Sequence, residues 1–94
     1  SLFEVLNGTL ENAPMIKECP LNLECQLYEL VDLPKAILVL GEVMTAYSDD
    51  RFMTNGILDP KKIDPILLTQ PDNHYWTIGE IVGNAFAVGK KLKR

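Results

Sequence analysis

The sequence has few of the residues that metal sites and disulfide frameworks require. It contains one histidine and two cysteines, so clustered imidazoles cannot hold a zinc ion within one chain. It also lacks a phosphate-binding P-loop, a G-x-G-x-x-G turn, an H-E-x-x-H pair and a Cys-x-x-Cys pair. We therefore expect no metal site, and no residue is assigned a catalytic role from these motifs.

The two cysteines, Cys19 and Cys25, are six residues apart in a segment with an extended pattern. A strand of that length separates them by roughly 20 Å, whereas a disulfide needs Cα atoms within about 7 Å of each other. We expect two free thiols in a reducing compartment, which predicts a cytoplasmic protein.

Long hydrophobic runs are also missing. The longest uninterrupted apolar run, Ala36 to Leu40, has five residues, far fewer than the ~20 that a membrane-spanning helix needs. Positive charge is scarce outside the C-terminal end: four of the nine basic residues lie within the last five positions, and residues 1–89 carry a net charge of −8. Such an acidic body repels phosphate backbones, so we expect neither a membrane nor a nucleic acid as a partner.

What is present indicates a small globular β protein. Hydrophobic residues make up 47% of the 94 residues, which suits one small core. Apolar residues alternate from Leu21 to Leu27, and the phase changes at Tyr28, which predicts a β-bulge. A turn at Asp32-Leu33-Pro34-Lys35 then leads into a long strand, Ala36 to Tyr47, antiparallel to the first. Ile66 to Thr69 is a further short strand.

A helix is predicted at the C-terminal end. Thr77-Ile78-Gly79-Glu80 has the spacing of a capping box, in which the threonine accepts from helix amides and the glutamate reaches back. Apolar residues follow at spacings of three and four and form one stripe: Ile78, Ile81, Val82, Ala85 and Phe86. The basic residues at the end of the chain suit the C-terminus of this helix.

Chemistry-bearing side chains are sparse. Tyr75 and Trp76 are adjacent aromatics in an expected loop before the helix, and they either stack on a planar ligand or hold the helix start against the sheet. His74 is interpreted as a surface or structural histidine, because no partner for a general base is evident. Glu24 and Glu42 are interpreted as the polar face of the sheet.

Several linked motifs together resemble the flavin reductase-like, FMN-binding split-barrel family, and flavoredoxins in particular. The resemblance covers nearly the whole chain, with the motifs in the family's order. They are Ala13-Pro14-Met15-Ile16-Lys17-Glu18-Cys19-Pro20-Leu21-Asn22-Leu23-Glu24-Cys25, Gly41-Glu42-Val43, Pro71-Asp72-Asn73-His74-Tyr75-Trp76-Thr77-Ile78-Gly79-Glu80 and Val82-Gly83-Asn84-Ala85-Phe86-Ala87-Val88-Gly89.

The resemblance implies that residues 1–94 are one partial domain, the C-terminal half of a family barrel. The expected fold is mainly β with a C-terminal α-helix, forming part of an antiparallel split β-barrel. The family binds FMN, is usually homodimeric, and passes electrons between a nicotinamide donor and an acceptor. The complete barrel would be a flavin reductase-like oxidoreductase, and the 94-residue chain alone is expected to be inactive.

The resemblance also implies cofactor-binding positions, and the chain departs from the family at two of them. Flavoredoxins commonly place a histidine five residues before the Gly-Glu pair, where this chain has Ala36, and a phenylalanine before a threonine, where it has Leu68. Tyr75 and Trp76 match the family motif and are the expected rim of the cofactor site, and Lys35 is placed to reach an anionic group.

Three functions remain open at this stage. The first is part of a flavoredoxin-type electron-transfer protein, with FMN bound weakly or not at all by this chain alone. The second is a non-enzymatic barrel half that keeps a dimerisation surface, and the third is a β-domain that binds a small ligand. In each case we expect a homo-oligomer, because the apolar strand from Ala36 to Leu40 needs cover on both faces.

Overall fold

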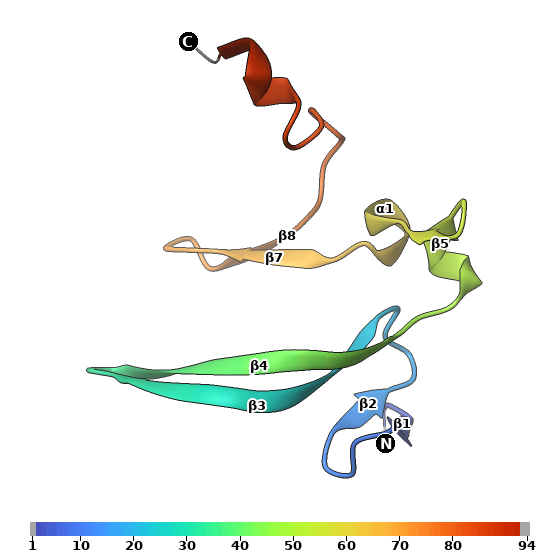
Figure 1. Ribbon diagram of the computed structural model, residues 1–94, viewed down its shortest axis with the longest axis vertical. Helices are drawn as coiled ribbons and strands as arrows, with labels where there is room; N and C mark the ends of the chain where they lie inside the picture. The colour runs from blue at the N-terminus through green and yellow to red at the C-terminus, as the bar shows by residue number, and fades with distance from the viewer. Residues whose placement is uncertain (1, 93–94) are drawn as a thin grey trace. The chain divides into compact units, whose positions relative to one another are not determined.

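The computed structural model describes residues 2–92, and its secondary structure is mainly β-strand (Figure 1). Strands that follow each other along the chain pair as antiparallel two-stranded sheets. These pairs are β1 (Val5–Asn7) with β2 (Pro14–Ile16), β3 (Asn22–Leu33) with β4 (Ala36–Tyr47), β5 (Met53–Thr54) with β6 (Ile57–Leu58), and β7 (Ile66–Thr69) with β8 (His74–Thr77). By its internal contacts the chain divides into two compact units, Ser1–Ile63 and Asp64–Arg94, which are described separately.

The β3–β4 hairpin confirms the strand prediction for the middle of the sequence. The two strands pair from Asn22 with Tyr47 to Leu33 with Ala36. The turn is Pro34-Lys35 and is shorter than predicted, because Asp32 and Leu33 are paired residues of β3. The register shifts between Leu27 and Glu29, where the apolar phase changes, and again between Glu24 and Cys25. Such bulges bend and twist a strand locally.

The segment after β4 forms four short elements of secondary structure. Asp49 caps a short 3₁₀ helix, η1 (Asp50–Phe52), by accepting a hydrogen bond from the amide of Arg51. The β5–β6 hairpin turns through Asn55 and Gly56, whose φ angles are 55° and 76°. Asn-Gly is the typical pair for a two-residue hairpin turn of this kind. A four-residue helix, α1 (Pro60–Ile63), follows.

The predicted C-terminal α-helix is wrong. Thr77 is the last residue of β8, where it pairs with Ile66 instead of capping a helix. Residues 78–84 are irregular, and the only helical segment described beyond β8 is a 3₁₀ helix, η2 (Val88–Leu92). Most of the predicted apolar stripe is exposed to solvent, with Val82 97% and Phe86 95% exposed. A helix of this length depends on packing of its apolar face, and Phe86 has a φ of 66°, outside the helical region.

The predicted split barrel is also not observed. In a closed barrel every strand is hydrogen-bonded to a neighbour on each side. Within residues 2–92, each strand pairs only with its own hairpin partner, and no closed barrel forms. The part of the fold prediction that holds is the predominance of antiparallel strands.

Side-chain burial is slight in the described residues. Met15 on β2 and Glu24 on β3 are the buried side chains, whereas most large apolar residues of β3, β4, β7 and β8 are exposed. No helix in residues 2–92 is long and apolar enough to cross a membrane. Lys93 and Arg94, predicted to stabilise a helix end, lie outside the described residues.

Candidate functional site

The β7–β8 hairpin brings three of the five predicted cofactor-binding residues onto one element. Leu68 lies opposite Tyr75 in the register, and Leu67 lies opposite Trp76. Directly opposed residues share a face of an antiparallel pair, and successive residues alternate between faces. Leu68 and Tyr75 therefore lie on one face, and Trp76 lies on the other.

This separation changes the interpretation of the two adjacent aromatics. In the expected loop both rings could meet the same planar ligand, but on β8 they point to opposite sides of the ribbon. Both remain accessible, Tyr75 at 69% and Trp76 at 52% exposure. A planar ligand lying against the hairpin can use one of the two rings, but not both.

The face that carries Trp76 holds a chain of hydrogen bonds. The indole Nε1 of Trp76 donates to the Thr69 hydroxyl over 2.7 Å, and that hydroxyl donates to Asp72 Oδ1 over 2.7 Å. The other carboxylate oxygen, Oδ2, lies 2.8 Å from His74 Nδ1. The His74 and Trp76 rings are perpendicular, with an interplanar angle of 88° and centroids 6.1 Å apart. These contacts fix the orientation of the indole on an exposed hairpin.

The loop that joins the two strands places Asp72 at the centre of this chain of bonds. The loop is Gln70-Pro71-Asp72-Asn73, with a cis Gln70–Pro71 bond and Asn73 at a φ of 56°. Hydrogen bonds from Thr69 and then His74 hold the pKa of Asp72 below its ordinary value, and together they outweigh the opposing effect of partial desolvation. Asp72 is therefore a carboxylate near neutral pH and acts as a hydrogen-bond acceptor.

The other two predicted cofactor residues lie in the first unit. Lys35 is the second residue of the β3–β4 turn, and Ala36 is the first residue of β4, paired with Leu33. Ala36 offers no side-chain hydrogen-bond donor at this position.

The hairpin fits one part of FMN better than the other. Exposed Trp76 on one face and exposed Tyr75 and Leu68 on the other offer surfaces on which a planar ring can stack. A phosphate needs cationic or backbone N–H donors. The β7–β8 hairpin, residues 66–77, contains no lysine or arginine, and its loop carries the Asp72 carboxylate. The side chains of this hairpin suit the isoalloxazine ring of FMN, but they do not suit the FMN phosphate group.

A second polar cluster lies in the first unit, and sequence reasoning missed it. Glu24 is only 1% exposed. It accepts hydrogen bonds from the Thr9 amide at 3.2 Å, the Thr9 hydroxyl at 3.0 Å, the Leu10 amide at 3.2 Å and the Tyr47 hydroxyl at 2.8 Å. Burial by itself would raise the pKa of Glu24, but the hydrogen bonds from Tyr47, Leu10 and Thr9 outweigh it, and the pKa is lowered.

Gly8 shows how closely the loop approaches this carboxylate. A Cβ atom at position 8 would lie 2.4 Å from a Glu24 carboxylate oxygen and 2.6 Å from the Tyr47 hydroxyl. The Asn7-Gly8 turn signal and the position of Glu24 are visible in the sequence, but their contact depends on how the loop folds over β3. The cluster joins the loop after β1 to the long hairpin, and every buried polar side-chain atom that the structure describes has a partner.

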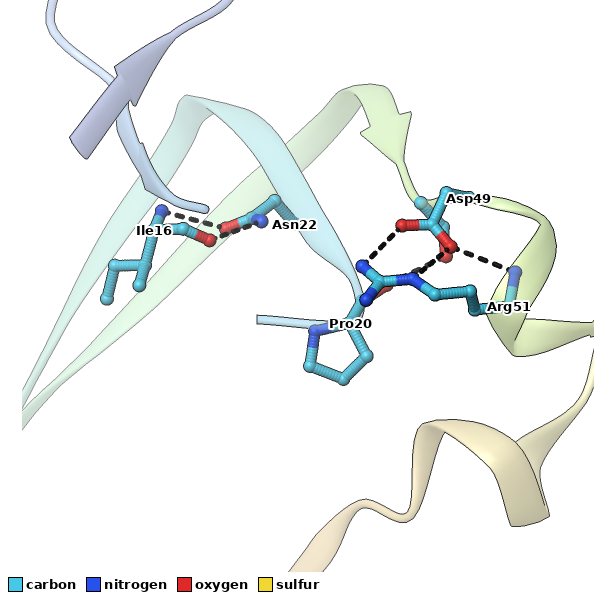
Figure 2. Close-up of polar contacts among 6 residues, drawn as sticks. Ile16, Pro20, Asn22, Asp49 and Arg51 are labelled. Carbon is cyan, nitrogen blue, oxygen red and sulfur yellow. Dashed lines mark hydrogen bonds and ion pairs between the residues drawn. The ribbon is translucent and has the colours of Figure 1, made fainter. Parts of the chain in front are cut away.

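A shallow cavity of about 250 Å³ lies beside this cluster. Its polar lining includes Asn22, Asp49 and Arg51, which Figure 2 shows with their partners. Two hydrogen bonds join Asn22 to the backbone of Ile16, and Asp49 forms a bidentate pair with Arg51. Both cationic side chains that line the cavity are already paired with carboxylates, Arg51 with Asp49 and Lys17 with Glu4.

The described residues also bear on the predictions for metals and thiols. Residues 2–92 contain no cluster of three or more His, Cys, Asp or Glu side chains that could hold a metal ion. Cys19 and Cys25 are both free and exposed. The segment is not extended throughout as predicted, because Cys19 lies in a turn between β2 and β3, where its amide donates to the Ile16 carbonyl.

Comparisons with known proteins identify similar structures. Neither a scan of protein-family models nor a search of curated proteins found a match. A crystal structure of flavoredoxin from Methanosarcina acetivorans matches 98% of this chain with 50% sequence identity and a TM-score of 0.87. A flavoredoxin of Desulfovibrio vulgaris (Miyazaki F) matches 94% of the chain with 26% identity and a TM-score of 0.82. The chain spans 50% and 47% of these two proteins, so it is similar to about half of a flavoredoxin.

Proposed function

We propose that this chain is part of a flavoredoxin-type electron-transfer protein that uses FMN. The observation that carries the proposal is the 50% identity to a flavoredoxin over 98% of the chain. The match includes both the β7–β8 hairpin and the long β3–β4 hairpin, because almost no residue is left outside it. We further propose that residues 1–94 correspond to the C-terminal half of such a domain, and that a nicotinamide donor supplies the electrons.

In this proposal the β7–β8 hairpin contributes to the rim around the flavin ring. Trp76 is held by its bond to Thr69 and keeps an open aromatic surface, which suits stacking on a planar heterocycle. Tyr75 and Leu68 provide an apolar surface on the other side of the hairpin. Lys35, in the β3–β4 turn, is the proposed contact for an anionic group, and Ala36 is a position where the chain lacks a polar contact. FMN supplies the capacity to accept and release electrons when it is bound.

A non-enzymatic domain is the alternative, and two residues favour it. Ala36 and Leu68 replace a histidine and a phenylalanine of the related motif, and the hairpin lacks a phosphate ligand. In this alternative the chain serves as a dimerisation domain or binds a small ligand without redox chemistry. In either case we propose that it forms a homo-oligomer.

An FMN titration separates the two functions. We expect the purified 94-residue chain to be colourless, because the phosphate has no ligand on the hairpin, but to bind added FMN weakly and saturably. Fluorescence anisotropy of FMN would measure the binding. Replacing Trp76 by Ala removes the proposed stacking surface and should weaken FMN binding about fivefold.

Tyr28→Ala is the matched control for this titration. Tyr28 is an exposed aromatic on β3 that is not among the proposed cofactor-binding residues, so its loss removes a comparable ring and should leave FMN binding unchanged. The absence of any saturable FMN response in the unaltered chain would contradict the electron-transfer proposal and favour the alternative. Flavin that copurifies at near one equivalent per chain would show that this chain contains a phosphate site after all.

A further inference from the structure

We propose that His74, held by Asp72, is a specificity-determining residue beside Trp76. Its free ring nitrogen, Nε2, would accept a hydrogen bond from an amide or imide N–H at the edge of a planar heteroaromatic ligand. The inference rests on the proposed function, because it requires that such a ligand stacks on the Trp76 face of the β7–β8 hairpin.

The proton on His74 can be placed from its partner. An ionised carboxylate has only acceptor oxygens, and Asp72 Oδ2 lies 2.8 Å from Nδ1 of the imidazole. A hydrogen bond at that distance requires Nδ1 to carry the proton and donate it. When the ring is neutral, this tautomer presents a lone pair at Nε2. No hydrogen bond to Nε2 is found among the described residues, whose only contact to the imidazole nitrogens is the one from Nδ1.

The position of Asp72 is itself fixed. Its other oxygen accepts from the Thr69 hydroxyl, which in turn accepts from Trp76 Nε1. Thr69 thus orients the carboxylate and the indole together, and the carboxylate orients the imidazole. Thr69 and Asp72 act as positioning residues, since neither needs to touch the ligand.

The two rings then form a corner. They stand at 88° to each other, and more than half of each side chain is open, with His74 at 66% and Trp76 at 52% exposure. A planar molecule that stacks on the indole would run parallel to one ring and meet the plane of the other ring at a right angle. An imidazole in that position contacts the edge of the ligand, where hydrogen-bonding groups of heterocycles lie.

The chemistry of this corner selects one type of edge. An acceptor at Nε2 favours a ligand N–H and disfavours a carbonyl or an alkylated nitrogen, because neither of these donates a hydrogen bond, and a ligand stacked on the indole would exclude the water that could otherwise donate it. A flavin ring offers an imide N–H, and a nicotinamide ring offers an amide N–H. The Asp72 carboxylate nearby also disfavours an anionic group at the same place.

Binding of methylated ring analogues to the whole 94-residue chain tests the inference. Trp76 is the chain's single tryptophan, so its emission reports directly on this hairpin. We expect lumiflavin to bind about fivefold more tightly than N3-methyllumiflavin, which corresponds to one neutral hydrogen bond. A parallel comparison of 1-methylnicotinamide with its N,N-dimethylamide analogue shows whether the corner accepts a nicotinamide ring instead.

Two variants connect this preference to the named residues. His74→Phe keeps a ring but removes the acceptor, and Asp72→Asn no longer imposes the Nδ1–H tautomer, so both should lose the preference for the unmethylated ring. Asp64→Asn is the matched control, because it removes a carboxylate from the same unit and keeps a residue type that tolerates the φ of 53° found there. His74 is also the chain's single histidine, so long-range ¹H–¹⁵N NMR reads its tautomer without ambiguity.

The outcomes separate the inference from the proposed function. Equal binding of methylated and unmethylated rings, with Trp76 emission still quenched, would overturn the role of His74 and leave flavin binding intact. A His74 ring protonated at Nε2 in the unliganded chain would also overturn it. If no planar ring gives a saturable response, both the inference and the proposed flavin site on this hairpin fail.

Discussion

At the scale of single residues, the most deeply buried side chain that the structure describes is an acid, Glu24, and not an apolar residue. Glu24 accepts four hydrogen bonds from two backbone amides and two hydroxyls. A buried charge is tolerated when hydrogen-bond donors replace the water it has lost. Four protein donors do so at the Glu24 carboxylate. This explains how an acidic residue on an otherwise regular strand pattern can be almost fully enclosed.

The acid stability of the chain should depend on Glu24. Because its pKa in the folded chain is lowered, its contribution to stability is complete above its ordinary value of 4.5 and is lost as the pH falls through the folded value. Glu24→Gln should therefore flatten the loss of stability below about pH 4.5 in urea melts followed by circular dichroism. Glu42→Gln, at an exposed position on the same hairpin, controls for the loss of one negative charge. An acid limb that keeps its slope in Glu24→Gln would contradict this assignment.

Gly8 provides a steric test of the same cluster. An alanine methyl at this position would overlap the Glu24 carboxylate and the Tyr47 hydroxyl, so either the loop or the hairpin must move. We expect Gly8→Ala to destabilise the chain by about 1–3 kcal/mol in urea unfolding. Gly79→Ala is the comparison, since a Cβ there meets nothing within 4 Å. If the two substitutions have equal effects, the loop does not approach Glu24 as closely as described.

At the scale of elements, local patterns predicted the hairpins well and the packing poorly. The alternation from Leu21 to Leu27, the phase change at Tyr28 and the turn signal at Pro34 lead to the observed β3–β4 hairpin and its bulge. The predicted turn began at Asp32 and was two residues too long, because Asp32 and Leu33 pair with β4. Ile66 to Thr69 is also a strand as predicted. Strands, bulges and tight turns of this kind depend on residues that are close together in the sequence, so they can be predicted from local patterns.

The errors arise where distant contacts decide the structure. Tyr75 and Trp76 were placed in a loop because Thr77 and Glu80 have capping-box spacing, yet Thr77 completes a strand by pairing with Ile66. The expected helix carries Gly79 and Gly83, each costing about 1 kcal/mol relative to alanine. Ile81, Val82 and Phe86 of its predicted apolar stripe are at least 86% exposed, so packing does not offset that cost. The β5–β6 hairpin could have been predicted from the Asn55-Gly56 pair, which is typical of two-residue hairpin turns. It was not predicted, because the surrounding residues are mostly polar.

The loop of the β7–β8 hairpin can be tested through its left-handed residue. Asn73 has a φ of 56°, which asparagine and glycine tolerate but a β-branched residue does not. Asn73→Val should destabilise the hairpin by about 1–2 kcal/mol, and Asn73→Gly should be nearly neutral. Trp76 emission during urea unfolding reports on this hairpin, and Asn12→Val, whose backbone lacks a positive φ, is the control. Similar losses from Val and Gly at position 73 would show that the loop adopts another conformation.

At the scale of the whole molecule, the long hairpin lacks cover for its apolar side chains. Register pairs alternate between faces, so Val31 and Leu38 lie on one face of the β3–β4 ribbon, and Leu30 and Val39 lie on the other. Leu38, Leu30 and Val39 are about half exposed or more. A two-stranded ribbon of this kind is marginal in water by itself, because both faces and both outer edges remain unsatisfied.

A second copy of the chain is the partner that is always available to cover these faces, so we expect a two-fold dimer with Val39, Val43 and Met44 at or near the shared surface. Light scattering on the eluting chain should give a mass near 21 kDa, twice the 10.5 kDa of one chain. Val39→Lys places a charge on the apolar ribbon and should shift the mass toward the monomer. Ile57→Lys, at an exposed position on β6, should not, because that strand lies outside the proposed surface. A mass of 10.5 kDa at every concentration would mean that the chain does not dimerise, and polydisperse high mass would mean that the exposed strands associate without a defined two-fold interface.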